Sequence, residues 1–202
     1  MKILIRCSSD PKMGLGHFMR CIRLHDQLKK NGKFVKLYID KRSEFMKKFN
    51  FEYDEIYPTK KKFINQNLDA NLFINKVFSK FKKEKKIVVK DDYRFSFNWE
   101  KKVSKKLNAK MIIFDDFDNS NHFADIIINS KTKYFDQNNT TISNTNKKKT
   151  ILLLGPKYSI INKIEKNKKF KKFTVVVNFG GTKNILLVNN ILSMIIKNNK
   201  SI

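Results

Sequence analysis

The order of apolar and amphipathic segments in the first 40 residues constrains the fold of this chain more than any other feature. A short apolar run at residues 2–6 is followed by polar residues and two glycines, Gly14 and Gly16. From residue 17 to about residue 30 apolar residues recur at steps of three and four, and a second apolar run spans residues 34–39. Strand, glycine loop, helix and strand in this order form a βαβ unit, whose crossover is right-handed and whose strands are parallel. The sequence therefore predicts an α/β fold with a Rossmann-like parallel sheet.

The same alternation continues beyond residue 40. Apolar runs bracketed by charge predict strands covered on both faces at residues 86–89, 111–114, 125–128 and 151–154. Helical spacing predicts one helix within residues 59–85 and another that begins near residue 97 or 99 and ends at residue 107. Residues 136–150 have no apolar periodicity and are expected to form a loop or linker.

A second, shorter α/β pattern occurs near the end of the chain. Residues 173–179 form an apolar run, which is followed by a glycine turn and a helical pattern to about residue 196. A lone strand and helix cannot close a hydrophobic core. We therefore expect a first domain at residues 1–155, a connector at residues 156–172 and the start of an incomplete second domain at residues 173–202.

Composition and cysteine content narrow the class of protein. Hydrophobic residues make up 41% of the chain and aromatic residues 12%, which is enough for a globular core. No segment has the apolar length of a membrane span, and the N-terminus turns polar too early for a signal peptide, so a cytoplasmic protein is expected. Cys7 and Cys21 have neither a metal-binding spacing nor a disulfide framework, and we expect both to fill the core.

The net charge of +26 raises the hypothesis of a nucleic-acid partner. However, the basic residues are 39 Lys and 5 Arg, and the chain has 23 Asn but 3 Ala. Lys and Asn have A/T-rich codons, so the charge is explained by the base composition of a genome acting on a tolerant surface. Arg, which phosphate recognition favours, is scarce. The sequence therefore predicts no specific nucleic-acid partner and no membrane partner.

The loop between the first strand and its helix is the first candidate site. Glycines such as Gly14 and Gly16 let a ligand approach the backbone, and amides at a helix N-terminus favour a phosphate, but a tight turn needs glycine as well. His17 at the helix start lies at the positive end of the helix dipole, which keeps an imidazole neutral, as a general base must be. A polar residue that merely begins the helix is the alternative.

Two acidic pairs follow predicted strands at the same edge of the sheet. Asp91 and Asp92 precede Tyr93, and Asp115 and Asp116 follow residues 111–114. Such carboxylates either cap the next turn or helix or take part in chemistry, and metal binding needs a denser set of ligands. Of the other two histidines, His25 is expected on the helix surface and His122 in a loop.

Several motifs in order along the chain resemble the UDP-2,4-diacetamido-2,4,6-trideoxy-β-L-altropyranose hydrolases of pseudaminic acid biosynthesis. The segment Gly14-Leu15-Gly16-His17-Phe18-Met19-Arg20-Cys21 is the most specific of these motifs. The others are Ile5-Arg6-Cys7-Ser8-Ser9, Asp91-Asp92-Tyr93 with Trp99-Glu100, Asp115-Asp116 with His122, Asp125 and Asn129, Leu154-Gly155-Pro156-Lys157-Tyr158, and Phe179-Gly180-Gly181-Thr182.

The resemblance implies a two-domain GT-B architecture, in which the N-terminal domain handles the sugar and the C-terminal domain binds UDP. It implies hydrolysis at the anomeric carbon with release of UDP and the free sugar, without metal or cofactor. His17 is expected to activate or position the attacking water. The residues expected to bind the UDP-linked deoxyamino sugar are Arg6, Gly14, Gly16, Arg20, Asp91, Tyr93, Asp115, Gly180, Gly181 and Thr182.

The chain departs from the family pattern at three places. Ser8 and Lys183 stand where the family usually has Asp, and the chain stops at Ile202, before most of the expected C-terminal domain. The missing half of the site would then come from a partner chain, from a second copy in a dimer, or not at all. The alternatives are a non-catalytic remnant that binds a sugar or a protein partner, a related GT-B transferase that uses an acceptor other than water, and non-specific nucleic-acid binding.

Overall fold

The computed structural model describes residues 1–10, 15–42, 46, 51–57, 65–117, 121–131, 150–161 and 185–198. The chain divides into two compact units, Met1–Ile161 and Asn162–Ile202. The division lies within the connector expected at residues 156–172. The two units are described separately below.

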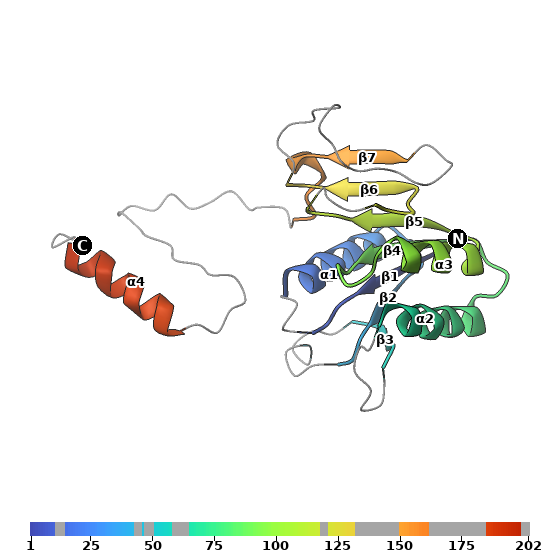
Figure 1. Ribbon diagram of the computed structural model, residues 1–202, viewed down its shortest axis with the longest axis horizontal. Coiled ribbons are helices and arrows are strands. Elements are labelled where there is room, and N and C mark those ends of the chain that lie inside the picture. The colour runs from blue at the N-terminus through green and yellow to red at the C-terminus, as the bar shows by residue number, and fades with distance from the viewer. Residues whose placement is uncertain are drawn as a thin grey trace. The chain divides into compact units, whose positions relative to one another are not determined.

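The first unit is built on a sheet whose strands all run parallel (Figure 1). Its strands are β1 (Lys2–Cys7), β2 (Val35–Ile39), β3 (Tyr53–Glu55), β4 (Lys86–Asp91), β5 (Ala109–Phe114), β6 (Ile126–Asn129) and β7 (Ile151–Leu154). The order across the sheet is β3-β2-β1-β4-β5-β6-β7, which confirms the predicted Rossmann-like α/β fold. After β1 the chain moves toward β2, whereas after β4 it moves the other way toward β5. The sheet therefore has its topological switch point between β1 and β4, where ligands of such folds bind.

Both faces of the sheet are covered in the described part of the unit. On one face α1 (Leu15–Lys30) packs Phe18 and Cys21 against a cluster that includes Ile5 and Val89. On the other face α2 (Gln66–Lys80) and α3 (Phe97–Leu107) contribute to a cluster that includes Leu4, Val88 and Met111. Successive residues of a strand thus enter opposite cores, which explains why the central strands are continuous apolar runs rather than alternating ones. Cys7 and Cys21 are fully buried, as expected of core residues.

The structure corrects or extends some local predictions. His25 is 1% exposed, so it faces the core between α1 and the sheet rather than the solvent. The short edge strand β3 was not predicted, because Tyr53-Asp54-Glu55 has two acidic residues in three and no apolar run. The helix predicted within residues 59–85 is α2, and Asn65 caps it by accepting a hydrogen bond from the backbone N–H of Leu68.

In the second unit the described element is the helix α4 (Ile185–Asn198), which agrees with the helix expected to reach about residue 196. The strand expected at residues 173–179 lies outside the described residues, as does the loop at 136–150 except for Thr150. Within the described ranges, no helix combines the length and the hydropathy that crossing a bilayer requires.

Candidate functional site

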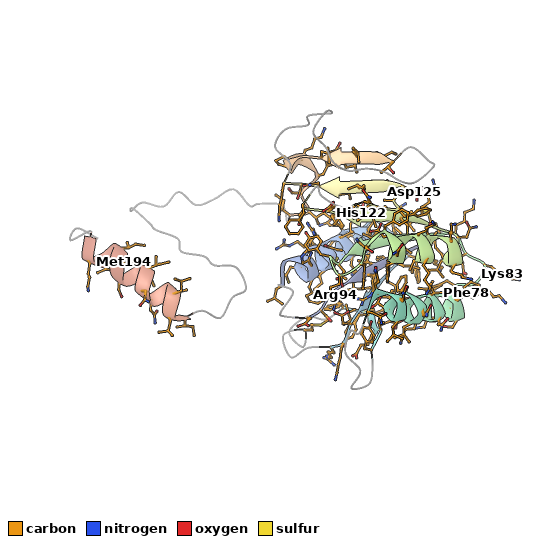
Figure 2. All side chains as sticks on the ribbon, in the orientation of Figure 1. Phe78, Lys83, Arg94, His122, Asp125 and Met194 are labelled. Atoms are coloured by element: carbon orange, nitrogen blue, oxygen red, sulfur yellow. The ribbon has the colours of Figure 1, made fainter. Side chains whose placement is uncertain are left out.

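The candidate site lies at the carboxyl edge of the sheet, beside the switch point. Three elements supply its side chains: the first turns of α1, the end of β4 with the residues that follow it, and the turn after β5. Figure 2 shows Arg94 and His122 toward this edge of the unit, whereas Phe78 and Lys83 lie toward the opposite edge. Residues that are far apart in the sequence meet here because parallel strands end at the same edge.

His17 and Asp91 form the central pair of the site. The Nδ1 atom of His17 lies 2.7 Å from Oδ1 of Asp91, whose carboxylate is fully buried. A carboxylate can only accept a hydrogen bond, so at this distance Nδ1 of His17 carries the proton. In the neutral ring the lone pair is then on Nε2, for which the described residues provide no hydrogen-bond partner. Burial alone would raise the pKa of Asp91, but hydrogen bonds from His17 and Arg20 hold it below its ordinary value of 3.8.

Arg20, one turn after His17, joins the two acidic pairs. Its Nε and Nη2 atoms donate to the two carboxylate oxygens of Asp91, each at 2.7 Å, and its Nη1 donates to Asp116 at 3.0 and 3.1 Å. Burial alone would lower the pKa of Arg20, but the two carboxylates raise it well above the ordinary value. Because two carboxylates neutralise the guanidinium, Arg20 organises the site and has little free charge for a phosphate.

Tyr93 connects Asp116 to the histidine. Its hydroxyl donates to Oδ2 of Asp116 at 2.6 Å, and its ring meets the ring of His17 edge-on at a centroid distance of 4.4 Å. Burial, and then the hydrogen bond to Asp116, raise the pKa of Tyr93, so the phenol keeps its proton. The single hydroxyl proton is used by Asp116, so toward a ligand the Tyr93 oxygen can act only as an acceptor, and Arg20 is already one donor beside it.

In each acidic pair one aspartate caps a turn and the other binds Arg20 in the site. Asp92 accepts the backbone N–H of Arg94 at 3.0 Å, and Asp115 accepts that of Phe117 at 2.9 Å. These two aspartates confirm the interpretation as turn-capping residues. Their neighbours Asp91 and Asp116 hold Arg20 instead.

Asp115 belongs to a buried chain of charges next to the site rather than to its accessible surface. His122 bridges the chain, with Nε2 3.0 Å from Asp115 and Nδ1 2.8 Å from Glu100, which in turn accepts a hydrogen bond from Lys90 at 2.7 Å. Burial alone would lower the pKa of His122, but the two carboxylates raise it above 6.5. His122 is thus a buried bridge between two acids, which its expected place in a loop did not suggest. Figure 2 shows His122 beside the sheet.

Arg6 is buried at the end of β1, on the face of the sheet that α2 covers. Its side chain is 0% exposed and makes ion pairs with Asp69 and Asp40, and Asp69 also accepts hydrogen bonds from Tyr57 and Trp99. A guanidinium enclosed in this way does not reach a ligand, so Arg6 has a structural role and holds the end of β1 to Asp40 and to Asp69 of α2. Ser8, one of the departures from the family pattern, donates to Oδ2 of Asp40 at 3.0 Å.

Asp40 follows β2, where dinucleotide-binding folds place the acid that holds a ribose hydroxyl. Here its carboxylate already accepts hydrogen bonds from Arg6, Arg94, the Ser8 hydroxyl and the Ser9 backbone N–H. These donors occupy its lone pairs. The position therefore serves the architecture of the loop rather than a ribose.

Gly16 is exposed at the start of α1, and a Cβ atom built on it meets nothing within 4 Å among the described residues. Packing among the described residues therefore does not require glycine there, and the open space would admit a ligand close to the backbone. The predicted residues Gly14, Gly180, Gly181 and Thr182 lie outside the described residues.

Sequence reasoning missed several residues that build the site. Asp116 and Glu100 were noted within motifs but not selected as site residues, and Phe117, Lys90 and Asp69 were not considered. A signal existed for Lys90, because a lysine inside an apolar strand needs a buried partner. No comparable signal marks Asp69, which lies on a helix among ordinary polar residues.

Comparison with known proteins finds a distant relative but no matching family. No family model matches the chain. The chain is 25% identical over 200 residues to an uncharacterized protein, MJ1062, of Methanocaldococcus jannaschii. The match covers 90% of this chain and 37% of that protein, so the chain spans little more than a third of the length of this relative.

Proposed function

We propose that this chain takes part in the hydrolysis of a UDP-linked 2,4-diacetamido-2,4,6-trideoxyhexose, with His17 as the general base that activates water. The observation that carries the proposal is the 2.7 Å contact between Nδ1 of His17 and the buried Asp91 carboxylate. A buried acid that orients a histidine and leaves its other nitrogen basic is the arrangement that general-base catalysis uses.

The proposed step is a substitution at the anomeric carbon. Nε2 of His17 takes a proton from water while the water oxygen bonds to the anomeric carbon, and the bond from that carbon to the diphosphate oxygen breaks. UDP leaves with the electron pair, and the proton remains on the imidazole beside Asp91. Because the nucleoside diphosphate is a good leaving group, orientation of water accounts for most of what the protein has to supply.

The charges of the site favour the sugar over the diphosphate as its occupant. The positive charge of Arg20 is balanced by the carboxylates of Asp91 and Asp116. A second cation, Lys131, has its Nζ atom 3.5 Å from Oδ2 of Asp116. Two phosphates bind more readily to free amides and cations than to a neutralised guanidinium. In the proposal, the residues around His17 therefore contact the sugar rather than the diphosphate. A cytoplasmic location is part of this proposal, in line with a nucleotide-activated sugar as substrate.

The test is UDP release by the purified chain from UDP-2,4-diacetamido-2,4,6-trideoxyaltrose in heavy-oxygen water. Hydrolysis at the anomeric carbon places the heavy oxygen in the sugar, whereas attack at phosphorus places it in the phosphate. His17→Ala is expected to lower the rate by about 10²- to 10⁴-fold, the usual contribution of a general base.

Gln27→Ala is the matched control, because Gln27 is an exposed residue of the same helix. It should leave the rate unchanged. Absence of UDP release by the wild-type chain, or undiminished release by His17→Ala, would overturn the proposal. Release that depends on an added sugar or lipid acceptor would instead indicate a transferase.

A further inference from the structure

Phe117 is the exposed aromatic residue at the edge of the candidate site. It is 58% exposed, although it follows directly the buried residues of β5 and the turn at Asp115. Its ring lies 4.7 Å from the ring of Tyr93, and Tyr93 in turn lies 4.4 Å from His17. The three rings form a continuous row that begins at the proposed base and ends at Phe117.

The turn that carries Phe117 is held firmly in place. The backbone N–H of Phe117 donates to Asp115 at 2.9 Å, and the other carboxylate oxygen of Asp115 is 3.0 Å from Nε2 of His122. The backbone N–H of Asp115 donates to the carbonyl of Ile128 at 3.1 Å. A buried network thus fixes the turn, and it presents a large apolar ring to the solvent rather than to the core.

Exposed phenylalanines elsewhere in the described chain have no such position. Phe34 is 43% exposed and packs against Phe81, and Phe78 is 40% exposed on α2, at the opposite edge in Figure 2. Phe117 is the one of these three whose ring contacts a side chain of the site. Exposing an aromatic ring to water costs free energy that a ligand recovers when it covers the ring.

We infer that Phe117 is a specificity-determining residue that packs against methyl groups of the sugar. This inference rests on the proposed function and extends it from the reacting carbon to the substituents. A 2,4-diacetamido-6-deoxy sugar carries a methyl group at the 6 position and two acetyl methyl groups, so it has far more apolar surface than an ordinary hexose. Tyr93, whose oxygen is an acceptor in this site, lies next to Phe117 and suits the N–H of an acetamido group.

Each of the three side chains in this row therefore recognises a different part of one ligand. His17 faces the reacting carbon, Tyr93 accepts a hydrogen bond from an amide N–H, and Phe117 covers a methyl group. Lys131, with Nζ 5.5 Å from the Phe117 ring centroid, flanks the ring and leaves more than half of its surface open.

The test measures binding and turnover side by side. Binding of free 2,4-diacetamido-2,4,6-trideoxyaltrose is followed by saturation-transfer NMR and titration for the wild type, Phe117→Ala, Phe117→Leu and the control Phe78→Ala. N-acetylglucosamine, with a hydroxymethyl group and a single acetamido group, is the comparison ligand. UDP release from the UDP-linked sugar is measured on the same four proteins.

Phe117→Ala is expected to weaken binding of the diacetamido sugar and to raise KM about tenfold, with little change in kcat. A tenfold change in affinity corresponds to the free energy of transferring roughly two methyl groups out of water. Phe117→Leu should retain most of the affinity, Phe78→Ala should match the wild type, and N-acetylglucosamine should be nearly insensitive to all three. Saturation transfer to the ligand methyl protons should fall in Phe117→Ala.

The outcomes separate this inference from the proposed function. Binding that depends on Phe117 without UDP release would overturn hydrolysis and leave the inference standing. UDP release that depends on His17 but is unaffected by Phe117→Ala would overturn the inference alone. Equal loss of affinity for both sugars would show a general effect on the site and would also overturn it, and absence of both binding and release would overturn both proposals.

Discussion

The Nδ1 atom of His17 lies 2.7 Å from Oδ1 of Asp91, and this contact joins the first turns of α1 to the end of β4 across the switch point of the sheet. Arg20 holds the same carboxylate through both of its oxygens. Asp91 is therefore fixed before any ligand arrives, and it fixes the imidazole in turn. Preorganisation of this kind supports the proposed role of His17 as a general base.

The first prediction concerns the tautomer of His17. Asp91→Asn replaces a pure acceptor by a group that can also donate, so the imidazole loses its enforced orientation, and UDP release should fall by about 10²- to 10⁴-fold. The chain has three histidines, so their ring nitrogens can be resolved by two-dimensional ¹⁵N NMR. The wild-type His17 should show a proton on Nδ1 in the neutral ring, and Asp91→Asn should lose this preference. A neutral His17 with its proton on Nε2 in the wild type would contradict the assignment.

The second prediction separates a ligand-related glycine from a structural one. Gly16→Ala should stabilise α1 by up to about 1 kcal/mol, since alanine is the better helix former and the space is open. The same variant should bind the UDP-linked sugar more weakly, because the added methyl group occupies the approach to the backbone. Thermal unfolding and a binding titration on one sample measure both effects.

Gly32→Ala is the matched control for Gly16. Gly32 has φ of +68° at the end of α1, so alanine there should destabilise the protein by about 1 kcal/mol and leave binding unchanged. If Gly16→Ala binds the ligand as well as the wild type does, then Gly16 has no role in ligand approach.

The strands and helices could be predicted because each carries its own periodic signal. The runs at 3–5 and 87–89 are apolar throughout, and such runs are typical of central parallel strands with helices on both faces. The edge strand β3 has no such signal, since it is paired with a single neighbour, β2, and contains two acids. Its register depends on β2 and not on its own residues.

The site could be predicted only in part, because its charged residues form pairs with residues that are far away in the sequence. The motif at residues 14–20 led to His17 and Arg20, but nothing near Arg6 in the sequence indicates that Asp69 lies against it, 63 positions away. The acidic pairs were visible, yet which member caps a turn and which holds Arg20 depends on the exact ends of β4 and β5. Such contacts are a property of the assembled sheet edge, so a single sequence does not specify them.

The third prediction concerns Arg6, which is fully buried against Asp69 of α2. Arg6→Met leaves Asp69 without its cationic partner in an apolar environment, and it should destabilise the protein by about 3–5 kcal/mol. Urea unfolding followed by circular dichroism measures the loss. Arg23→Met on α1 is the control, since Arg23 makes no ion pair within the described residues, and it should cost less than about 1 kcal/mol. A small effect of Arg6→Met on stability, combined with a large rise in KM, would instead favour direct contact of Arg6 with the substrate.

The fourth prediction is a pH dependence of stability that originates at His122. The pKa of His122 is raised above 6.5 in the folded state by Asp115 and Glu100. A group whose pKa is raised on folding contributes stability that is complete below its unfolded pKa and is lost as the pH rises through the folded pKa. The pKa values of Asp115 and Glu100 are lowered, so their contribution is present above their unfolded pKa values and is lost as the pH falls through the folded ones.

The interaction of His122 with both acids is therefore strongest at a pH above the titration of the carboxylates and below that of the imidazole. The free energy of unfolding, measured by urea titration from roughly pH 4 to roughly pH 9, should exceed that of His122→Gln most in the middle of this range. Subtracting the two curves removes the titration of all other groups. The difference should decline toward alkaline pH as His122 loses its proton, and toward acidic pH as Asp115 and Glu100 gain theirs. A difference that is constant with pH would mean that folding shifts none of these three pKa values, and it would contradict the ionic bridge.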